Sequence, residues 1–98
     1  MGLLVEYKVK DGKQAEHLEA MKAFIAGLRD LGDQGFTYTG YTADEGARFL
    51  AVFDFDDDAA KQRFLGSAPF AEYRDSSTPR FNGPPDTTAI SRIASTAD

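Results

Sequence analysis

A single histidine is the residue in this chain best suited to proton transfer near neutral pH. His17 lies four residues before Met21 and seven before Phe24, so the three side chains share one side of a predicted helix. On the flank of that apolar stripe, the imidazole could lean over the mouth of a cleft as a general base, or it could face solvent. We favour a structural role, because a lone histidine on a helix needs no function.

Three tyrosines and one arginine are the other candidates for a site. Tyr7, Tyr38 and Tyr73 can each hydrogen-bond a phenol or quinone oxygen while the ring stacks on the ligand. The alternative, which we favour for Tyr7 and Tyr38, is that they are core rings with their hydroxyls at the surface. Arg92 interrupts a segment of small and apolar residues, where its charge could balance an oxyanion or pair with an acid across a sheet.

Four acids that lie close together in the sequence do not form a metal-binding pattern. Asp54, Asp56, Asp57 and Asp58 lack the alternating ligands, glycine turn and final glutamate of a calcium loop. Acidic side chains here suit the start of a helix, where backbone N–H groups are free. Because the acids lack a metal-loop pattern, we expect no metal. Because the glycines show no phosphate-binding spacing, we expect no nucleotide cofactor.

Composition narrows the class of protein further. The net charge is −5, with 11 basic and 16 acidic residues, so nucleic-acid binding has no electrostatic basis. No window approaches the roughly 18 apolar residues of a membrane span, and the lack of cysteine favours a reducing cytoplasm. The chain has 98 residues, 42% of them hydrophobic, and we expect one domain over residues 1–98.

Hydrophobic periodicity predicts the elements that must position these side chains. Alternating residues predict strands, and apolar residues at helical spacing predict helices. The predicted strands are residues 3–9, 36–41, 47–55 and 87–94. The predicted helices run from Asp11 to Gly32, and from residues 56–58 to the breakers Gly66 and Pro69. A short helical turn that places Phe70 and Tyr73 on one side follows the second helix.

The order of elements is β-α-β-β-α-β, which is the ferredoxin-like split βαβ arrangement of an α+β protein. It predicts a four-stranded antiparallel sheet with both helices on one face. Leu4, Leu50 and Val52 alternate away from that face and would form an apolar patch. We therefore expect a homodimer in which a second sheet covers the patch. The alternative is that these are isolated surface residues, which are common.

Residues 64–73, Phe-Leu-Gly-Ser-Ala-Pro-Phe-Ala-Glu-Tyr, resemble a segment of the antibiotic biosynthesis monooxygenase family. There, a helix end and a Ser or Thr precede an apolar residue and an aromatic or His that faces a pocket. The resemblance covers most of the chain and implies a dimeric α+β barrel with a helix–sheet cleft for a planar aromatic or hydrophobic compound. It implies a functional ring at Tyr73 and a substrate pocket lined by Tyr7, Tyr38, Phe53, Phe64 and Phe70.

Two kinds of oxygenase occur in this family. Some members oxidise phenolic or quinol substrates with O2 and use neither metal nor flavin, whereas others degrade haem with an Asn, Trp and His set. In this chain Val5, Phe64 and Arg74 stand near the places of the Asn, Trp and His, so haem breakdown is not expected. Pro69 occupies a place where some quinol oxidases of the family carry His.

The resemblance therefore implies a cofactor-independent, monooxygenase-like homodimer that acts on a small phenol or quinol. In such an oxidoreductase Tyr73, Arg92 or His17 would assist proton removal, while the protein supplies placement and excludes water. The alternative is a non-catalytic binding or accessory protein that holds a hydrophobic metabolite in the same pocket.

Overall fold

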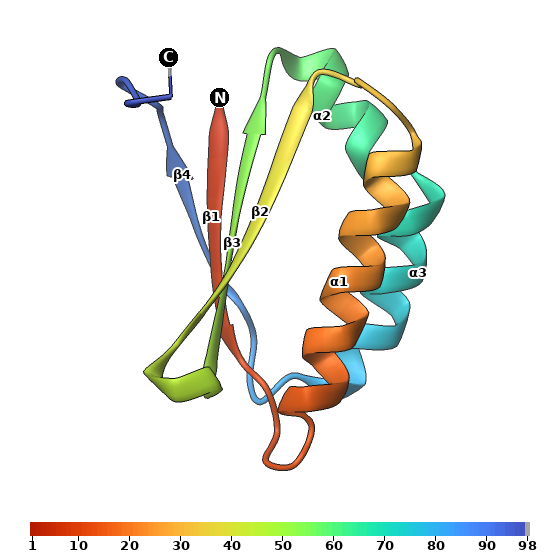
Figure 1. Cartoon of the computed structure of the whole chain (residues 1–98), viewed down its shortest axis with the longest axis vertical. Helices are drawn as coiled ribbons and strands as arrows, with labels where there is room; N and C mark the ends of the chain where they lie inside the picture. Colours follow the sequence, from red (N-terminus) through yellow and green to blue (C-terminus); the bar gives the residue numbers. More distant parts are fainter. Residues whose placement is uncertain (98) are drawn as a thin grey trace.

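Four antiparallel strands form a sheet, and three helices cover one of its faces, in this computed structural model, which describes residues 1–97 (Figure 1). The strands are β1 (Gly2–Lys8), β2 (Phe36–Ala43), β3 (Arg48–Phe55) and β4 (Asp86–Ile90). The helices are α1 (Gln14–Asp30), α2 (Asp58–Leu65) and α3 (Ala68–Ser77), and 3-10 turns cover Asp44–Gly46 (η1) and Thr78–Arg80 (η2). The predicted α+β class, with its helices on one face of the sheet, is confirmed.

The central strand is β1, which lies between β3 and β4 in the order β2-β3-β1-β4. Both neighbours run antiparallel to it, and the register places Leu4 opposite Val52 and Tyr7 opposite Phe49. Because side chains alternate along a strand, Tyr7 and Phe49 face the helices, whereas Leu4 and Val52 face the other side. The face without helices therefore carries the adjoining apolar side chains that the sequence predicts.

The segment after α2 is more regular than the sequence predicts. A short turn is expected after Pro69, but α3 has ten residues. Ser67 is its N-cap, with Oγ accepting a hydrogen bond from the Phe70 N–H at 3.3 Å, and Pro69 lies in the first turn, where an N–H needs no partner. The proline therefore helps to start a helix instead of ending one.

None of the helices in residues 1–97 is both long enough and apolar enough to span a bilayer.

The last strand is shorter than the sequence predicts. Alternation suggests a strand up to residue 94, but β4 ends at Ile90. Ile90 pairs with Gly2, which is the first residue of β1, so the central strand offers no ladder partner beyond this point. Arg92 consequently lies outside the sheet.

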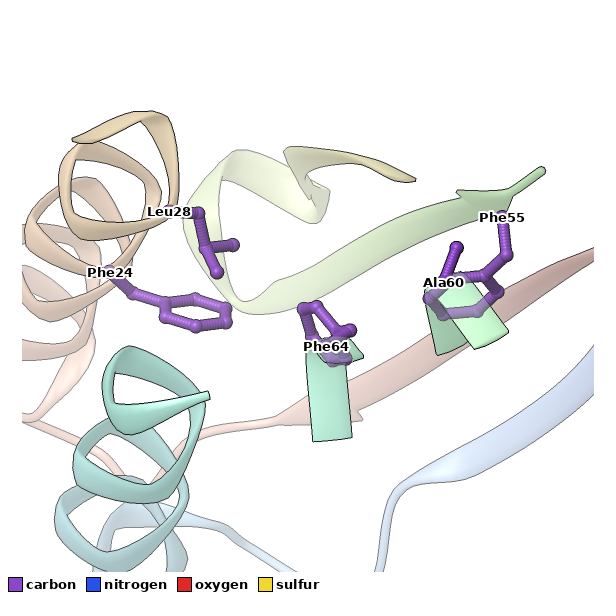
Figure 2. Packing of buried hydrophobic residues seen from close by; sticks show 5 residues of the cluster. All are labelled: Phe24, Leu28, Phe55, Ala60 and Phe64. Atoms are coloured by element: carbon purple, nitrogen blue, oxygen red, sulfur yellow. The ribbon is translucent and has the colours of Figure 1, made fainter. Parts of the chain in front are cut away.

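The aromatic core between helices and sheet is centred on Phe64. Figure 2 shows its ring among Phe24 and Leu28 from α1, Ala60 from α2 and Phe55 from β3. Phe64 is 2% exposed. Its ring centroid lies between 4.9 and 6.1 Å from the centroids of Phe24, Phe36, Phe53, Phe55 and Phe70. Side chains of three helices and two strands therefore meet at one residue.

Replacing Phe64 with alanine should destabilise the fold by about 3–5 kcal/mol, because the cavity removes contacts with all of these rings at once. Leu65→Ala is the matched control: this neighbouring side chain is 43% exposed, and its loss should cost less than about 1 kcal/mol. Urea unfolding followed by circular dichroism measures both. Equal losses in the two variants would contradict this account of the core.

Candidate functional site

An apolar pocket of about 290 Å³ lies between α2, α3 and the helix-covered face of the sheet. Its walls are mainly aliphatic and aromatic side chains, and three tyrosines and Ser77 are among the residues that line it. The sequence-predicted residues that line it are Tyr7, Tyr38, Phe53, Phe64, Phe70 and Tyr73. Tyr7 and Tyr73 meet here although 66 positions separate them in the sequence.

His17 is completely buried behind two of these tyrosines. Its Nε2 atom lies 2.7 Å from the Tyr7 hydroxyl oxygen and 3.0 Å from that of Tyr73, and the two oxygens are 2.9 Å apart. The three atoms form a triangle of hydrogen-bonding contacts that joins α1, β1 and α3. Because His17 does not itself line the pocket, it can influence a ligand only through the tyrosines.

Arg80 contacts the opposite edge of the His17 ring. Its Nε–H donates to His17 Nδ1 at 3.2 Å, and its Nη2 donates to the Oγ of the buried Ser77 at 3.1 Å. Across residues 1–97, no carboxylate lies within ion-pair distance of Arg80. Its positive charge therefore acts directly on the imidazole. We call Tyr7, His17, Tyr73, Ser77 and Arg80 the His17 cluster.

Ring contacts hold the His17 cluster in one arrangement. The Tyr73 ring stacks on Phe24, with centroids 4.4 Å apart and 5° between the planes. The His17 ring meets Phe49 edge-on, with centroids 4.7 Å apart. These neighbours restrict rotation of both rings, so the hydroxyls are in position before any ligand enters.

Burial keeps the ionisable side chains of the His17 cluster uncharged, except for Arg80. Burial, and secondarily the Arg80 guanidinium, lowers the pKa of His17 to about 4. Burial also raises the pKa of Tyr7, Tyr38 and Tyr73 above the usual tyrosine range. At neutral pH the imidazole is therefore neutral and the hydroxyls keep their hydrogens, so these tyrosines are hydrogen-bond donors and not bases.

Two of the sequence-predicted catalytic residues occupy unexpected positions. His17 neither leans over the pocket mouth nor faces solvent, since it is 0% exposed. Arg92 is exposed beyond the end of β4 and does not line the pocket. The cation beside the hydroxyls is Arg80, which the sequence analysis missed. The one sign of this role in the sequence is that Arg80 follows Ser77 by three residues, a spacing typical of neighbours on a helical turn.

The acidic run at residues 54–58 has structural partners. Asp57 is the N-cap of α2, and its Oδ1 accepts a hydrogen bond from the Ala60 N–H at 2.8 Å. Asp54 lies 3.9 Å from the Met1 ammonium group. In the described part of the chain, no three His, Asp or Glu side chains gather closely enough to hold a metal ion. The capping role predicted for these acids is thus seen at Asp57.

Comparison with known proteins identifies the fold. No protein-family model and no curated protein sequence match this chain. A solved structure named antibiotic biosynthesis monooxygenase has a TM-score of 0.79 at 9% identity, covering 95% of this chain and 98% of that one. Rv0793 from Mycobacterium tuberculosis has a TM-score of 0.82 at 14% identity, covering 97% and 96%. PA3566 from Pseudomonas aeruginosa has a TM-score of 0.80 at 17% identity, covering 95% and 93%. The chain therefore has the fold of antibiotic biosynthesis monooxygenases.

Acid should weaken the fold through His17. An unfolded chain binds a proton on this imidazole below about pH 6.5, whereas the folded chain, with Tyr7, Tyr73 and Arg80 around the ring, binds it only below about 4. Stability is therefore full above pH 6.5 and falls as the pH drops towards 4, by at most roughly 3 kcal/mol from this group.

His17→Gln isolates that contribution, because the amide has a donor and an acceptor but does not titrate. The free energy of unfolding, measured in urea at several pH values, should show the advantage of wild type over the variant shrinking between pH 6.5 and 4. A difference that stays constant over this range would refute the neutral, buried state of His17.

Proposed function

We propose that this chain is a monooxygenase-like member of the antibiotic biosynthesis monooxygenase family that oxidises a small phenol or quinol with O2 in the helix–sheet pocket. The observation that carries the proposal is Tyr73, which lines the pocket and whose hydroxyl is fixed by contacts with Tyr7 and His17. Similarity in fold to a protein named antibiotic biosynthesis monooxygenase supports the family assignment.

The pocket suits a flat aromatic body with an oxygen at one end. Its volume of about 290 Å³ is close to the lower end, about 300 Å³, of the range for small-molecule sites. Phe53, Phe64 and Phe70 offer ring faces and edges for a planar ligand. A ligand packed against them can direct its oxygen to the hydroxyls of Tyr7 and Tyr73.

The proposed reaction takes its reactivity from the substrate. Loss of a proton to solvent gives a carbanion whose charge is shared with the ring oxygen, and this carbanion transfers electrons to O2. In the keto form of such a phenol, the CH2 group opposite the carbonyl loses two hydrogens and gains one oxygen atom, while the second oxygen atom leaves as water. Tyr73 stabilises the oxyanion by donating a hydrogen bond, and the positive charge of Arg80 lies behind it. His17 positions Tyr73, and Arg92 has no role in this scheme.

A non-catalytic binding role is the second candidate. Of the pocket-lining side chains in residues 1–97, none is a histidine or a carboxylate. The tyrosines stay protonated, so no base stands beside a bound ligand. Such a pocket can hold an aromatic metabolite without promoting loss of its proton.

We also propose that two copies of the chain pair through the sheet face that lacks helices. On this face Leu4 lies opposite Val52, and Leu50 lies between Glu6 and Tyr41. Tyr41 is 54% exposed in the single chain. In a two-fold dimer the same patch lies on both sides of the interface, so a second sheet would bury these side chains.

Oxidation of anthrone to anthraquinone tests the enzymatic proposal, because the CH2 group lies opposite a ketone that can become the oxyanion. Wild type should produce quinone absorbance faster than a blank without protein, and Tyr73→Phe should slow the reaction by about a hundredfold, as loss of an oxyanion donor does. Tyr41→Phe, on the other face of the sheet, should retain the rate. Binding of anthrone with no quinone above the blank would exclude the enzyme and support the binding protein.

Sedimentation velocity at micromolar concentration tests the dimer. Wild type should sediment with the mass of two chains, and Leu50→Asp should sediment as one, because the carboxylate would lie in the apolar interface. Leu18→Asp adds the same charge on α1, where the leucine is 37% exposed, and should remain dimeric. Wild type that sediments as one chain would overturn the proposal.

A further inference from the structure

The hydrogens of the His17 cluster can be counted from its contacts. A guanidinium group has donors and no acceptor, so the Arg80 Nε–H, 3.2 Å from His17 Nδ1, must meet a lone pair there. A neutral imidazole with a lone pair on Nδ1 carries its hydrogen on Nε2. The Arg80 contact therefore fixes the tautomer of His17, and the imidazole presents a donor to the tyrosines.

A donor at His17 Nε2 leaves one hydroxyl hydrogen of the triangle without an acceptor. Nε2–H can donate to the Tyr7 oxygen at 2.7 Å, and the Tyr7 hydroxyl can then donate to the Tyr73 oxygen at 2.9 Å. The Tyr73 hydroxyl cannot donate back to Nε2, although the two atoms are 3.0 Å apart, because a protonated ring nitrogen has no lone pair. In the mirror arrangement Nε2–H donates to Tyr73 and Tyr73 donates to Tyr7, so in either case the hydrogen of one of the two tyrosines points out of the triangle.

Nearby hydroxyls pass this surplus hydrogen on but do not remove it. Ser77 and Tyr38 interact with the Tyr73 hydroxyl and could accept from it. Each of them, however, brings a hydrogen of its own that then needs an acceptor, and Ser77 Oγ already accepts from Arg80 at 3.1 Å. The hydroxyls receive hydrogen bonds from His17 Nε2–H and from Arg80, and each hydroxyl adds one hydrogen of its own. The last hydroxyl in the chain therefore keeps a hydrogen that has no acceptor within the cluster. Because Tyr7, Tyr38, Tyr73 and Ser77 are all lining residues of the pocket, we place that last donor at the pocket.

We infer that the pocket selects aromatic ligands that carry a hydrogen-bond-accepting oxygen, a carbonyl or an oxyanion, over ligands whose polar group can only donate. Arg80 and His17 act as positioning residues, since neither needs to touch the ligand. The inference rests on the proposed function in one respect, which is that the ligand is a small aromatic compound in this pocket.

Three tricyclic compounds of nearly equal size test this selectivity. Fluorenone has a carbonyl acceptor, fluorene has a CH2 group in its place, and carbazole has an N–H donor. Dissociation constants can be measured by equilibrium dialysis at pH 7. Wild type should bind fluorenone about tenfold more tightly than fluorene, which is the scale of one net hydrogen bond. Carbazole should bind no more tightly than fluorene, because its N–H meets a donor.

Two variants trace the preference to the His17 cluster. The double variant Tyr7→Phe/Tyr73→Phe should reduce the fluorenone preference towards the value for fluorene, because it removes both hydroxyls of the triangle that can carry the surplus hydrogen. Arg80→Met should reduce it as well, because His17 is then free to move its hydrogen to Nδ1 and to accept from a tyrosine through Nε2. Arg29→Met, which changes an exposed arginine at the end of α1, should leave the preference unchanged. Circular dichroism confirms that each variant is folded before its binding is interpreted.

The tautomer can be observed directly, because His17 is the only histidine of the chain. Nitrogen-15 NMR of the imidazole should show a protonated Nε2 and an unprotonated Nδ1 in wild type at pH 7, and a mixture of tautomers in Arg80→Met. A change confined to packing would not alter this signature.

The outcomes separate the selectivity from the proposed function. Equal binding of the three compounds by wild type, or a hydrogen on Nδ1, would overturn the donor inference while leaving an aromatic-binding pocket in place. If none of the compounds binds, the proposed function fails together with the inference. Tighter binding of carbazole than of fluorenone would show that the pocket presents an acceptor and would also overturn it.

Discussion

The burial of one uncharged imidazole is the constraint that links the fold to the site. His17 is 0% exposed, so both of its ring nitrogens need partners inside the protein. Those partners are Tyr7 on β1, Tyr73 on α3 and Arg80 in the turn η2, and each belongs to a different part of the chain. Satisfying one histidine therefore fixes how α1, the central strand and the last helix meet. The same contacts fix Tyr7 and Tyr73, which both line the pocket.

The rings of the pocket also belong to the core, so stability and binding share residues. Phe64 and Phe55 are buried in the core cluster, and Phe53 and Phe70 pack against it, yet all four line the pocket. Loss of a ring changes both properties, whereas loss of the Tyr73 hydroxyl leaves the stacked ring on Phe24 in place. Changes of single polar atoms are for this reason the informative ones in this protein.

Periodicity in the sequence predicts which face of each element is apolar, and this was enough for the four strands, the antiparallel sheet and the face that the helices cover. Periodicity cannot say where β4 ends, because its last residue, Ile90, pairs with Gly2, the first residue of β1. It also cannot say which polar atoms meet, because the contacts of His17 with Tyr73 and Arg80 span 56 and 63 positions. Arg80 was missed, and Arg92 was chosen, because a local pattern contains no information on such distant pairs.

Hydroxyls that can donate a hydrogen bond but cannot take a proton from a ligand limit the chemistry of the pocket. The Tyr73 hydroxyl and the charge of Arg80 lower the energy of an oxyanion, but neither can take a proton from a ligand at neutral pH. Such a site promotes reaction only of compounds that ionise readily once their oxygen is stabilised, as phenols and anthrone-like ketones do. For less acidic compounds the same hydroxyls give binding without turnover. Under the proposed function, the acidity of the bound compound, and not a second set of residues, would decide whether that compound is oxidised or only held.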